Sequence, residues 1–308
     1  MQPNYIHVTH DAQETRLIHY RLGEGERRIL ITAGVHGREH GGIQAAYELV
    51  RRLADVPLRG RVDVLPVCNP LAYAAETRFT PLGDRNMSRA FTSGQPADLT
   101  EAMSQAVTSL AEKADVVLNL HSAGNARYLP HVVFYREQDV EWVTSLGFPF
   151  AIKRGTPETL AHHISSHLRP DQRTATLELG GGIVAFSDDV ALGVDLTLAY
   201  LGRSGFLGPG DYEREPTPPE MVWLTDARQL VYALGEGAFY THTQLGANFV
   251  SGESFGFWVG LNDLRPCPVL APTTGKLIYI RTRNRVSHGE TLAMFLPLAH
   301  KQQHEEER

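Results

Sequence analysis

Short apolar segments alternate with longer amphipathic segments over the first two thirds of this 308-residue chain. The short segments are rich in valine, isoleucine and leucine, as expected of strands that are covered on both faces. This alternation predicts an α/β fold with a mostly parallel or mixed sheet and helices on both faces. The predicted strands are Ile29–Ala33, Val62–Val67, Val116–Leu120, Val132–Tyr135 and Thr174–Leu179, and the predicted helices are His40–Leu53, Leu99–Lys113, Asp139–Leu146, Glu158–Leu168 and Asp188–Leu201.

The pattern changes after Leu207, where glycine- and proline-rich turns interrupt the chain. The later apolar runs are short, turn residues separate them, and none is long enough for a helix of several turns. We therefore expect two domains, a catalytic domain over residues 1–207 and a small all-β module over residues 216–308. The strands predicted for this module are Leu230–Leu234, Phe255–Val259, Pro268–Leu270, Leu277–Ile280 and Thr291–Phe295.

Composition excludes several classes of protein. The net charge of −6 argues against nucleic acid as the main partner, because phosphate binding needs a basic face. No apolar run approaches the roughly 20 residues that span a bilayer, and the N-terminus does not have the pattern of a signal peptide. Cys68 and Cys267 lie in unlike contexts, which is typical of buried thiols in a cytoplasmic protein. We expect a cytoplasmic protein with a small-molecule substrate, and the sequence leaves the oligomeric state open, a homo-oligomer included.

Two histidines and a glutamate follow the first predicted strand, namely His36, Glu39 and His40. They lie at a strand-to-helix crossover, where open α/β sheets bind ligands. A histidine and a glutamate three positions apart can reach one divalent metal, and catalytic zinc sites use such sets. His121, just past another predicted strand, is the candidate third ligand. The alternatives are a capping cluster for His36 with Glu39, and a satisfied strand-end histidine for His121.

A further carboxylate and several arginines accompany these residues. Glu178 lies on a predicted buried strand, where a carboxylate is costly unless it is paired or functional. Beside a metal it could act as a general base; a structural ion pair is the alternative. The long loop Phe79–Ala97 and the residues before it carry Arg78, Arg85 and Arg89, which belong to solvated surface or to a carboxylate-binding site. His163 and His167, four positions apart, are interpreted as residues of a surface helix.

The ordered set of motifs resembles the succinylglutamate desuccinylase/aspartoacylase family of zinc-carboxypeptidase-like metallohydrolases. Order, spacing and strand-end placement match from about Ile29 to Leu207, and Val269–Leu277 resembles the β-rich appendage of bacterial members. The motifs that carry the resemblance are His36–Glu39, Thr77–Phe79, Asn86–Phe91, Leu120–Ser122 and Leu177–Gly181.

This resemblance implies a zinc-dependent amidohydrolase that removes the acyl group from an N-acylated amino acid or a similar small amide. It implies about one zinc ion per chain, bound by His36, Glu39 and His121. Glu178 would be the general base, and Arg78 would stabilise the oxyanion beside the scissile carbonyl. The residues implied for substrate binding are Asn86 and Arg89, with Arg85 in reserve for the carboxylate contact.

One position departs from the family's loop, which reads Asn-Leu-Asn-Arg and continues with Phe-Pro-Gly. Here the loop reads Asn86-Met87-Ser88-Arg89, and Phe91 is followed by Thr92-Ser93-Gly94. Ser88 thus replaces an amide that is expected to help Arg89 bind a carboxylate. The acyl group and the amino acid of the substrate therefore stay open.

Three other functions are compatible with parts of the sequence. His36–His40 also fits the inverted-zincin motif His-x-x-Glu-His, in which both histidines bind zinc from one helix. A zinc carboxypeptidase acting on peptides would use the same metal chemistry. The segment Ala271–Gly275 resembles the hairpins of biotinyl and lipoyl carriers, but Lys276 runs directly into a predicted strand. We expect the β module to be structural, shaping or covering the mouth of the active site or forming a subunit contact.

Overall fold

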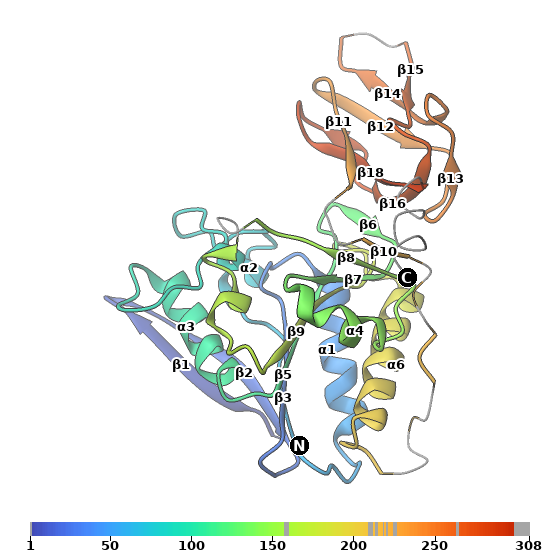
Figure 1. Ribbon diagram of the computed structural model, residues 1–308. Coiled ribbons are helices and arrows are strands. Elements are labelled where there is room, and N and C mark those ends of the chain that lie inside the picture. Colours follow the sequence, from blue (N-terminus) through green and yellow to red (C-terminus); the bar gives the residue numbers. More distant parts are fainter. Residues whose placement is uncertain are drawn as a thin grey trace. The chain divides into compact units, whose positions relative to one another are not determined.

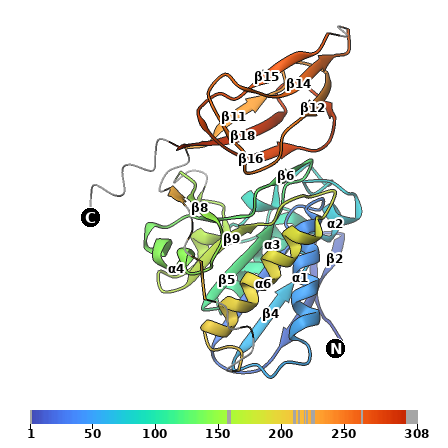
Figure 2. The same cartoon turned by 90° about the vertical axis from the view of Figure 1, so that its right-hand side faces the viewer.

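The computed structural model describes residues 2–156, 160–208, 212, 215–217, 219, 221–223, 227–262 and 265–298. The chain forms two compact units, seen in Figures 1 and 2. Unit 1 consists of residues 1–124 and 130–224, and unit 2 of residues 125–129 and 225–308. The expected α/β fold with a C-terminal β-rich part is confirmed.

A mixed sheet forms the centre of unit 1. In the part of the chain that the structure describes, nine strands pair in the order β1-β2-β4-β3-β5-β9-β7-β8-β10. β3, β4, β5 and β9 are mutually parallel at its centre, whereas β1 and β2 form an antiparallel hairpin at one edge. The strands are β1 Asn4–His10, β2 Gln13–Leu22, β3 Arg28–Ala33, β4 Arg61–Leu65, β5 Val116–His121, β7 His131–Phe134, β8 Phe150–Lys153, β9 Arg173–Glu178 and β10 Met221–Trp223.

Helices cover both faces of this sheet. α1 and α6 pack side by side on one face, and α3 lies on the other (Figures 1 and 2). Buried leucines of α1 and α6 share one core with the sheet, and Met103 of α3 belongs to a second core. The helices are α1 His40–Leu53, α2 Pro70–Ala74, α3 Leu99–Ala111, α4 Val140–Thr144 and α6 Ser187–Arg203, with the short 3-10 turns η1 Met87–Arg89, η2 Glu137–Asp139 and η3 Ile164–His167.

The period of two along each strand decides which side chains share a face. In β3, Ile29 and Ile31 join the core under α1 and α6, and Leu30 joins the core under α3. The same alternation in β5 and β9 directs the odd-numbered residues of β5 and the even-numbered residues of β9 to the α3 face. His121 and Glu178 therefore lie on one face of the sheet.

Three expectations from the sequence were wrong or incomplete. The hairpin of β1 and β2 was not predicted, because half-exposed polar residues interrupt its apolar pattern. The helix predicted over Glu158–Leu168 does not continue through its second half: residues 158 and 159 lie outside the described residues, residue 160 is helical, and residues 161–168 make turns and η3. Cys68 is buried as expected, but Cys267 is exposed on a strand of unit 2.

Unit 2 contains two antiparallel sheets around an aromatic core. Among the described residues one sheet has the order β11-β18-β16-β13, with β6 paired to β16, and the other has the order β15-β14-β12-β17. The ring of Phe255 contacts Phe239, Phe249 and Phe295, which come from both sheets. The strands are β6 Ala126–Tyr128, β11 Gln229–Tyr232, β12 Gly237–Thr241, β13 Asn248–Phe249, β14 Ser254–Gly260, β15 Cys267–Leu270, β16 Gly275–Arg281, β17 Arg285–Val286 and β18 Thr291–Pro297.

None of the described helices is both long and apolar enough to cross a bilayer.

Candidate metal centre and active site

The site residues lie at the carboxyl ends of parallel strands in unit 1. His36 and Glu39 follow β3, His121 ends β5, and Glu178 ends β9. His121 and Glu178 are directly opposite each other in the register of β5 and β9. The carboxyl ends of neighbouring parallel strands meet at one edge of a sheet, so residues far apart in sequence converge there.

Two glycines allow the close packing that places these residues. A Cβ atom on Gly42 would lie 2.8 Å from the Leu120 carbonyl oxygen, so the first turn of α1 rests directly on the end of β5. A Cβ atom on Gly37 would lie 2.0 Å from the backbone of Ala72. The loop between His36 and α1 therefore fits only without side chains at these two positions.

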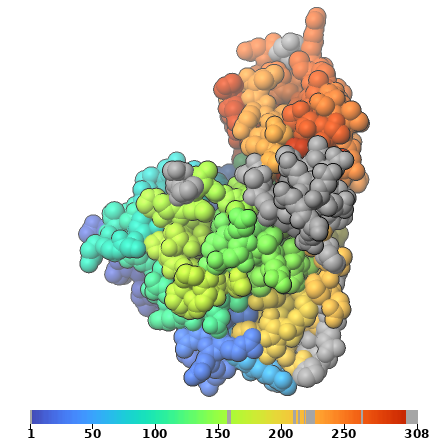
Figure 3. All heavy atoms as spheres, in the orientation of Figure 1, coloured from blue at the N-terminus to red at the C-terminus, as the bar shows by residue number. Residues whose placement is uncertain are grey.

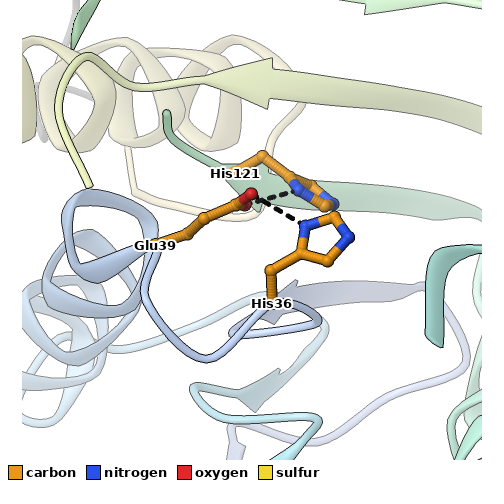
Figure 4. Close-up of side chains that lie close together, drawn as sticks. All are labelled: His36, Glu39 and His121. Carbon is orange, nitrogen blue, oxygen red and sulfur yellow. Dashed lines mark hydrogen bonds and ion pairs between the residues drawn. The ribbon is translucent and has the colours of Figure 1, made fainter. Parts of the chain in front are cut away.

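His36, Glu39 and His121 form a compact cluster (Figure 4). Glu39 Oε1 lies 2.8 Å from His36 Nδ1, and Glu39 Oε2 lies 2.7 Å from His121 Nδ1. Within the described residues this is the group whose ligand atoms all lie within 4.8 Å of one another. Glu39 occupies the N-cap position of α1 but makes no capping hydrogen bond with its side chain. Its carboxylate turns to the histidines instead, which argues against the capping-cluster alternative.

Two asparagines contact the outer nitrogens of these histidines. Asn86 Oδ1 lies 3.1 Å from His36 Nε2, and the Asn119 amide nitrogen lies 2.9 Å from His121 Nε2. The Thr32 hydroxyl in turn donates to Asn119 Oδ1 at 2.9 Å. Partners on the outer nitrogen fix the orientation of a ligating histidine. Sequence reasoning assigned Asn86 to substrate binding and did not identify Asn119; its position two residues before His121 on one strand face was the available signal.

Burial and mutual charge shift the ionisation of the cluster. Burial disfavours the charged form of Glu39, yet the charges of His36 and His121 lower its pKa well below the ordinary value. For His36, burial disfavours the charged imidazolium and so lowers the pKa below its ordinary value. The His36 imidazole therefore tends toward the neutral form. His121 differs, because the charge and hydrogen bond of Glu39 outweigh burial and raise its pKa.

These residues fit a divalent metal ion. His36 Nδ1 is a buried nitrogen without a hydrogen-bond partner, although it faces Glu39 Oε1 at 2.8 Å. The Asn86 oxygen accepts the proton of His36 Nε2, which leaves the Nδ1 lone pair directed at an anionic oxygen. A cation held between them would remove this repulsion. Two imidazoles and a carboxylate are also the donor set of open catalytic zinc sites.

Glu178 is buried beside this cluster. The residue is 8% exposed, and burial raises the pKa of its carboxyl above the ordinary value, with the Glu39 charge acting in the same direction and His121 against it. A carboxylate with a raised pKa beside a metal centre is a candidate general base.

The three candidate arginines have different surroundings. Arg78 Nη1 lies 2.7 Å from Glu39 Oε1, which places this cation at the cluster. Arg89 donates to the Ser88 carbonyl at 3.4 Å, which engages one of its five donors. Arg85 instead pairs with Asp98 at 3.0 Å and Glu101 at 2.6 Å, at the start of α3. Arg85 is therefore held by two carboxylates of the protein.

His163 was assigned to a surface helix, and this expectation was wrong. The residue is 5% exposed, and its ring lies 4.3 Å from the ring of Tyr135, centroid to centroid. The Tyr135 hydroxyl hydrogen-bonds Thr176, which shares a face of β9 with Glu178, at 2.9 Å. Tyr135 ends a predicted strand and His163 lies within the helix predicted over Glu158–Leu168, but the contact between their rings joins segments that the sequence pattern does not connect.

Two alternative functions find no support in the geometry. α1 begins at His40, whose ring packs against Tyr73, so His36 and His40 do not share a helix as the inverted-zincin motif requires. Lys276 lies within β16 and pairs in register with Asn248 and Leu296, whereas a carrier lysine stands at the tip of a hairpin.

Known proteins resemble this chain over more than half of its length. Residues 26–202 match the family model of the succinylglutamate desuccinylase/aspartoacylase catalytic domain. The N-alpha-acetyl-L-2,4-diaminobutyric acid deacetylase of Halomonas elongata is 28% identical over 288 residues, which cover 89% of this chain and 83% of that protein.

Solved structures share the fold over nearly the whole chain. A succinylglutamate desuccinylase/aspartoacylase from Rhodobacter sphaeroides superposes with a TM-score of 0.77 at 21% identity, covering 96% of this chain and 94% of that chain. The product-bound ectoine utilization protein EutE (DoeB) from Ruegeria pomeroyi superposes with a TM-score of 0.78 at 19% identity, covering 94% and 93%.

Proposed function

The chain belongs to the succinylglutamate desuccinylase/aspartoacylase family, and we propose that it is a zinc-dependent amidohydrolase that deacylates a small N-acylated amino acid or a similar amide. The cluster of His36, Glu39 and His121 carries this proposal. The Halomonas elongata relative, a deacetylase by name, supports hydrolysis of an amide bond.

The metal ligands would be His36, Glu39 and His121, with about one zinc ion per chain. Bound there, zinc would supply Lewis-acid polarisation of the acyl carbonyl and of a water molecule. Asn86 would hold the His36 ring in the tautomer and orientation that ligation through Nδ1 needs. Asn119 meets His121 Nε2 with its amide nitrogen, so ligation through His121 Nδ1 would require this amide to turn and present its oxygen.

Glu178 is the proposed general base. It would take a proton from the attacking water and pass it to the nitrogen of the leaving amine. Its buried position favours this role, because burial raises the pKa of its carboxyl toward neutral pH.

Arg78 and Arg89 would divide transition-state stabilisation and recognition between them. Arg78 contacts Glu39 at 2.7 Å, and from there it could donate to an oxyanion that develops on the acyl carbonyl. Arg89 would bind the substrate carboxylate with its planar guanidinium. Ser88, beside Arg89, makes a hydrogen bond to Asn86 at 2.8 Å instead of presenting an amide.

A substrate panel tests the proposal. Amine release would be measured with N-acetyl, N-succinyl and longer N-acyl amino acids, with Nα-acetyl-2,4-diaminobutyrate, and with peptides that have free C-termini. The expected result is hydrolysis of at least one small N-acyl amino acid and no release of C-terminal residues from peptides. Efficient release of C-terminal residues would establish a zinc carboxypeptidase instead.

A further inference from the structure

His163 is a buried histidine outside the proposed catalytic machinery. It precedes η3, and its Nδ1 accepts a hydrogen bond from the backbone N–H of Ser165 at 3.2 Å. The Ser165 hydroxyl lies 2.9 Å from the same nitrogen. In the part of the chain that the structure describes, its Nε2 makes no hydrogen bond with protein. One ring nitrogen is thus committed to the fold, while the other is available to a ligand.

The Ser165 contact determines the tautomer of His163. A backbone N–H can only donate, so Nδ1 must carry a lone pair and, in the neutral imidazole, Nε2 must carry the proton. Burial, and next the charge of Arg89, lower the pKa of His163 to about 3. The residue is therefore a fixed neutral donor at neutral pH.

The Arg89 loop is attached to the segment that carries His163. The Phe91 backbone N–H donates to the His162 carbonyl at 3.2 Å, and His167 Nε2 donates to the Phe91 carbonyl at 3.0 Å. The two segments adjoin in Figure 3, where residues near 90 are cyan and residues near 165 are yellow-green. Two hydrogen bonds, one between backbones and one from the His167 side chain, thus join the segment that carries Arg89 to the segment that carries His163.

The surroundings of His163 suit an anion. Arg89, His121 and Arg154 all lie close enough to act on the charge of His163. The Tyr135 ring, fixed through its hydroxyl to Thr176, packs against the imidazole and connects it to the strand that ends in Glu178. A neutral N–H among guanidinium groups complements a carboxylate oxygen without adding another buried charge.

We propose that His163 determines specificity, with its Nε2–H donating to the α-carboxylate of the acylated amino acid alongside Arg89. This inference rests on the proposed deacylase function and assigns a residue to its substrate recognition. His163 makes no contact with the scissile bond in this scheme, so it acts on binding of the carboxylate.

Two substitutions distinguish the contribution of His163 Nδ1 from that of His163 Nε2. In His163→Asn the side-chain amide reaches the position of Nδ1 and the donor at Nε2 is lost. In His163→Gln the amide N–H reaches the position of Nε2. The matched control is His162→Asn, which changes the exposed neighbouring histidine in the same way. Zinc content and circular dichroism would verify folding of each variant.

The readout is KM for the best N-acyl amino acid and for its counterpart with a carboxamide in place of the α-carboxylate. His163→Asn should raise KM for the acid by about tenfold or more, because hydrogen bonds to charged groups contribute at least that factor. KM for the carboxamide and kcat for both should change far less. His163→Gln should restore most of the affinity for the acid, and His162→Asn should match the wild type.

An equal rise in KM for acid and carboxamide, or no rise, would overturn the role of His163. If His163→Asn does not fold, His163→Phe, which keeps the packing on Tyr135 without donors, is compared between the same two substrates. Failure of the wild type to hydrolyse any N-acyl amino acid would count against the deacylase function itself. The two proposals therefore fail by different results.

Discussion

Buried ionisable side chains gather at the carboxyl ends of β3, β5 and β9. His36, Glu39, His121 and Glu178 are each no more than 8% exposed. Such groups are costly to bury unless they are paired or bind a ligand. Glu39 is paired on both oxygens, whereas His36 Nδ1 is left without a hydrogen bond. A metal ion bound at the cluster would give His36 Nδ1 the partner that it lacks.

Loss of a ligand should remove the metal. His36→Ala, Glu39→Ala and His121→Ala should each lower zinc content sharply, because three protein ligands are the usual minimum of a catalytic site. His40→Ala is the matched control, since His40 packs on Tyr73 outside the cluster. Elemental analysis of the purified variants is the measurement. Full zinc occupancy in any of the three would exclude that residue as a ligand.

Catalysis should be separable from metal binding at Glu178. Glu178→Gln keeps the shape of the side chain but removes its basicity, so kcat should fall by about 10²–10⁴-fold while zinc is retained. Steady-state kinetics on protein of measured zinc content tests this. Turnover close to that of the wild type would show that another group accepts the proton.

The two arginines should affect different kinetic constants. Arg78→Ala should lower kcat by roughly 10²-fold or more, since an oxyanion donor acts mainly in the transition state. Arg89→Ala should chiefly raise KM, because a carboxylate contact exists in both the ground state and the transition state. An unchanged KM in Arg89→Ala would mean that the substrate carboxylate binds elsewhere.

The strand-end residues of the candidate site could be predicted from sequence because each follows a recognisable apolar run. Their partners could not. Asn86 reaches His36 across 50 positions, and His163 is buried by contacts of irregular segments. Neither contact leaves a periodic trace in the sequence. Residues that orient or surround a site through loops therefore emerge only from the three-dimensional structure.

At the scale of elements, the helices and strands that could be predicted from sequence were the regular ones that other elements bury. The predicted helix His40–Leu53 coincides with α1, and the predicted central strands agree with β3, β4, β5 and β9 within two residues at each end. β1 and β2 escaped prediction because each exposes one side and mixes charged with apolar residues. The segment before β9, over residues 161–168, has a composition compatible with a helix. Its backbone instead forms turns and η3, and His163 and Ile164 are buried there.

The contact between α1 and β5 gives a prediction at this scale. Gly42→Ala would place a methyl group 2.8 Å from the Leu120 carbonyl oxygen. The helix must then shift, which should destabilise the protein by about 1–3 kcal/mol and weaken zinc binding by moving Glu39 away from His121. Denaturant unfolding and zinc titration measure the two effects. Gly235→Ala is the control, because its nearest neighbour would lie at 3.5 Å, and equal behaviour of the two variants would contradict the account.

At the scale of the whole molecule, the candidate site and the β-rich part belong to different units. All residues of the proposed zinc site lie in unit 1, and unit 2 has its own aromatic core. The role expected of the β-rich part in shaping or covering the mouth of the active site stays a prediction from the sequence, and a module that covers the mouth would exclude polypeptides by size. The substrate panel on the full chain tests it, with small N-acyl amino acids cleaved and longer peptides left intact.

Removal and return of the metal test the central claim most directly. The full chain would be treated with a chelator, freed of it, and titrated with zinc while hydrolysis of its best N-acyl amino acid is followed. We predict that activity disappears in the metal-free protein and returns in proportion to bound zinc, reaching its maximum at about one ion per chain. Full activity in protein shown to be free of metal would contradict the assignment of a zinc-dependent deacylase.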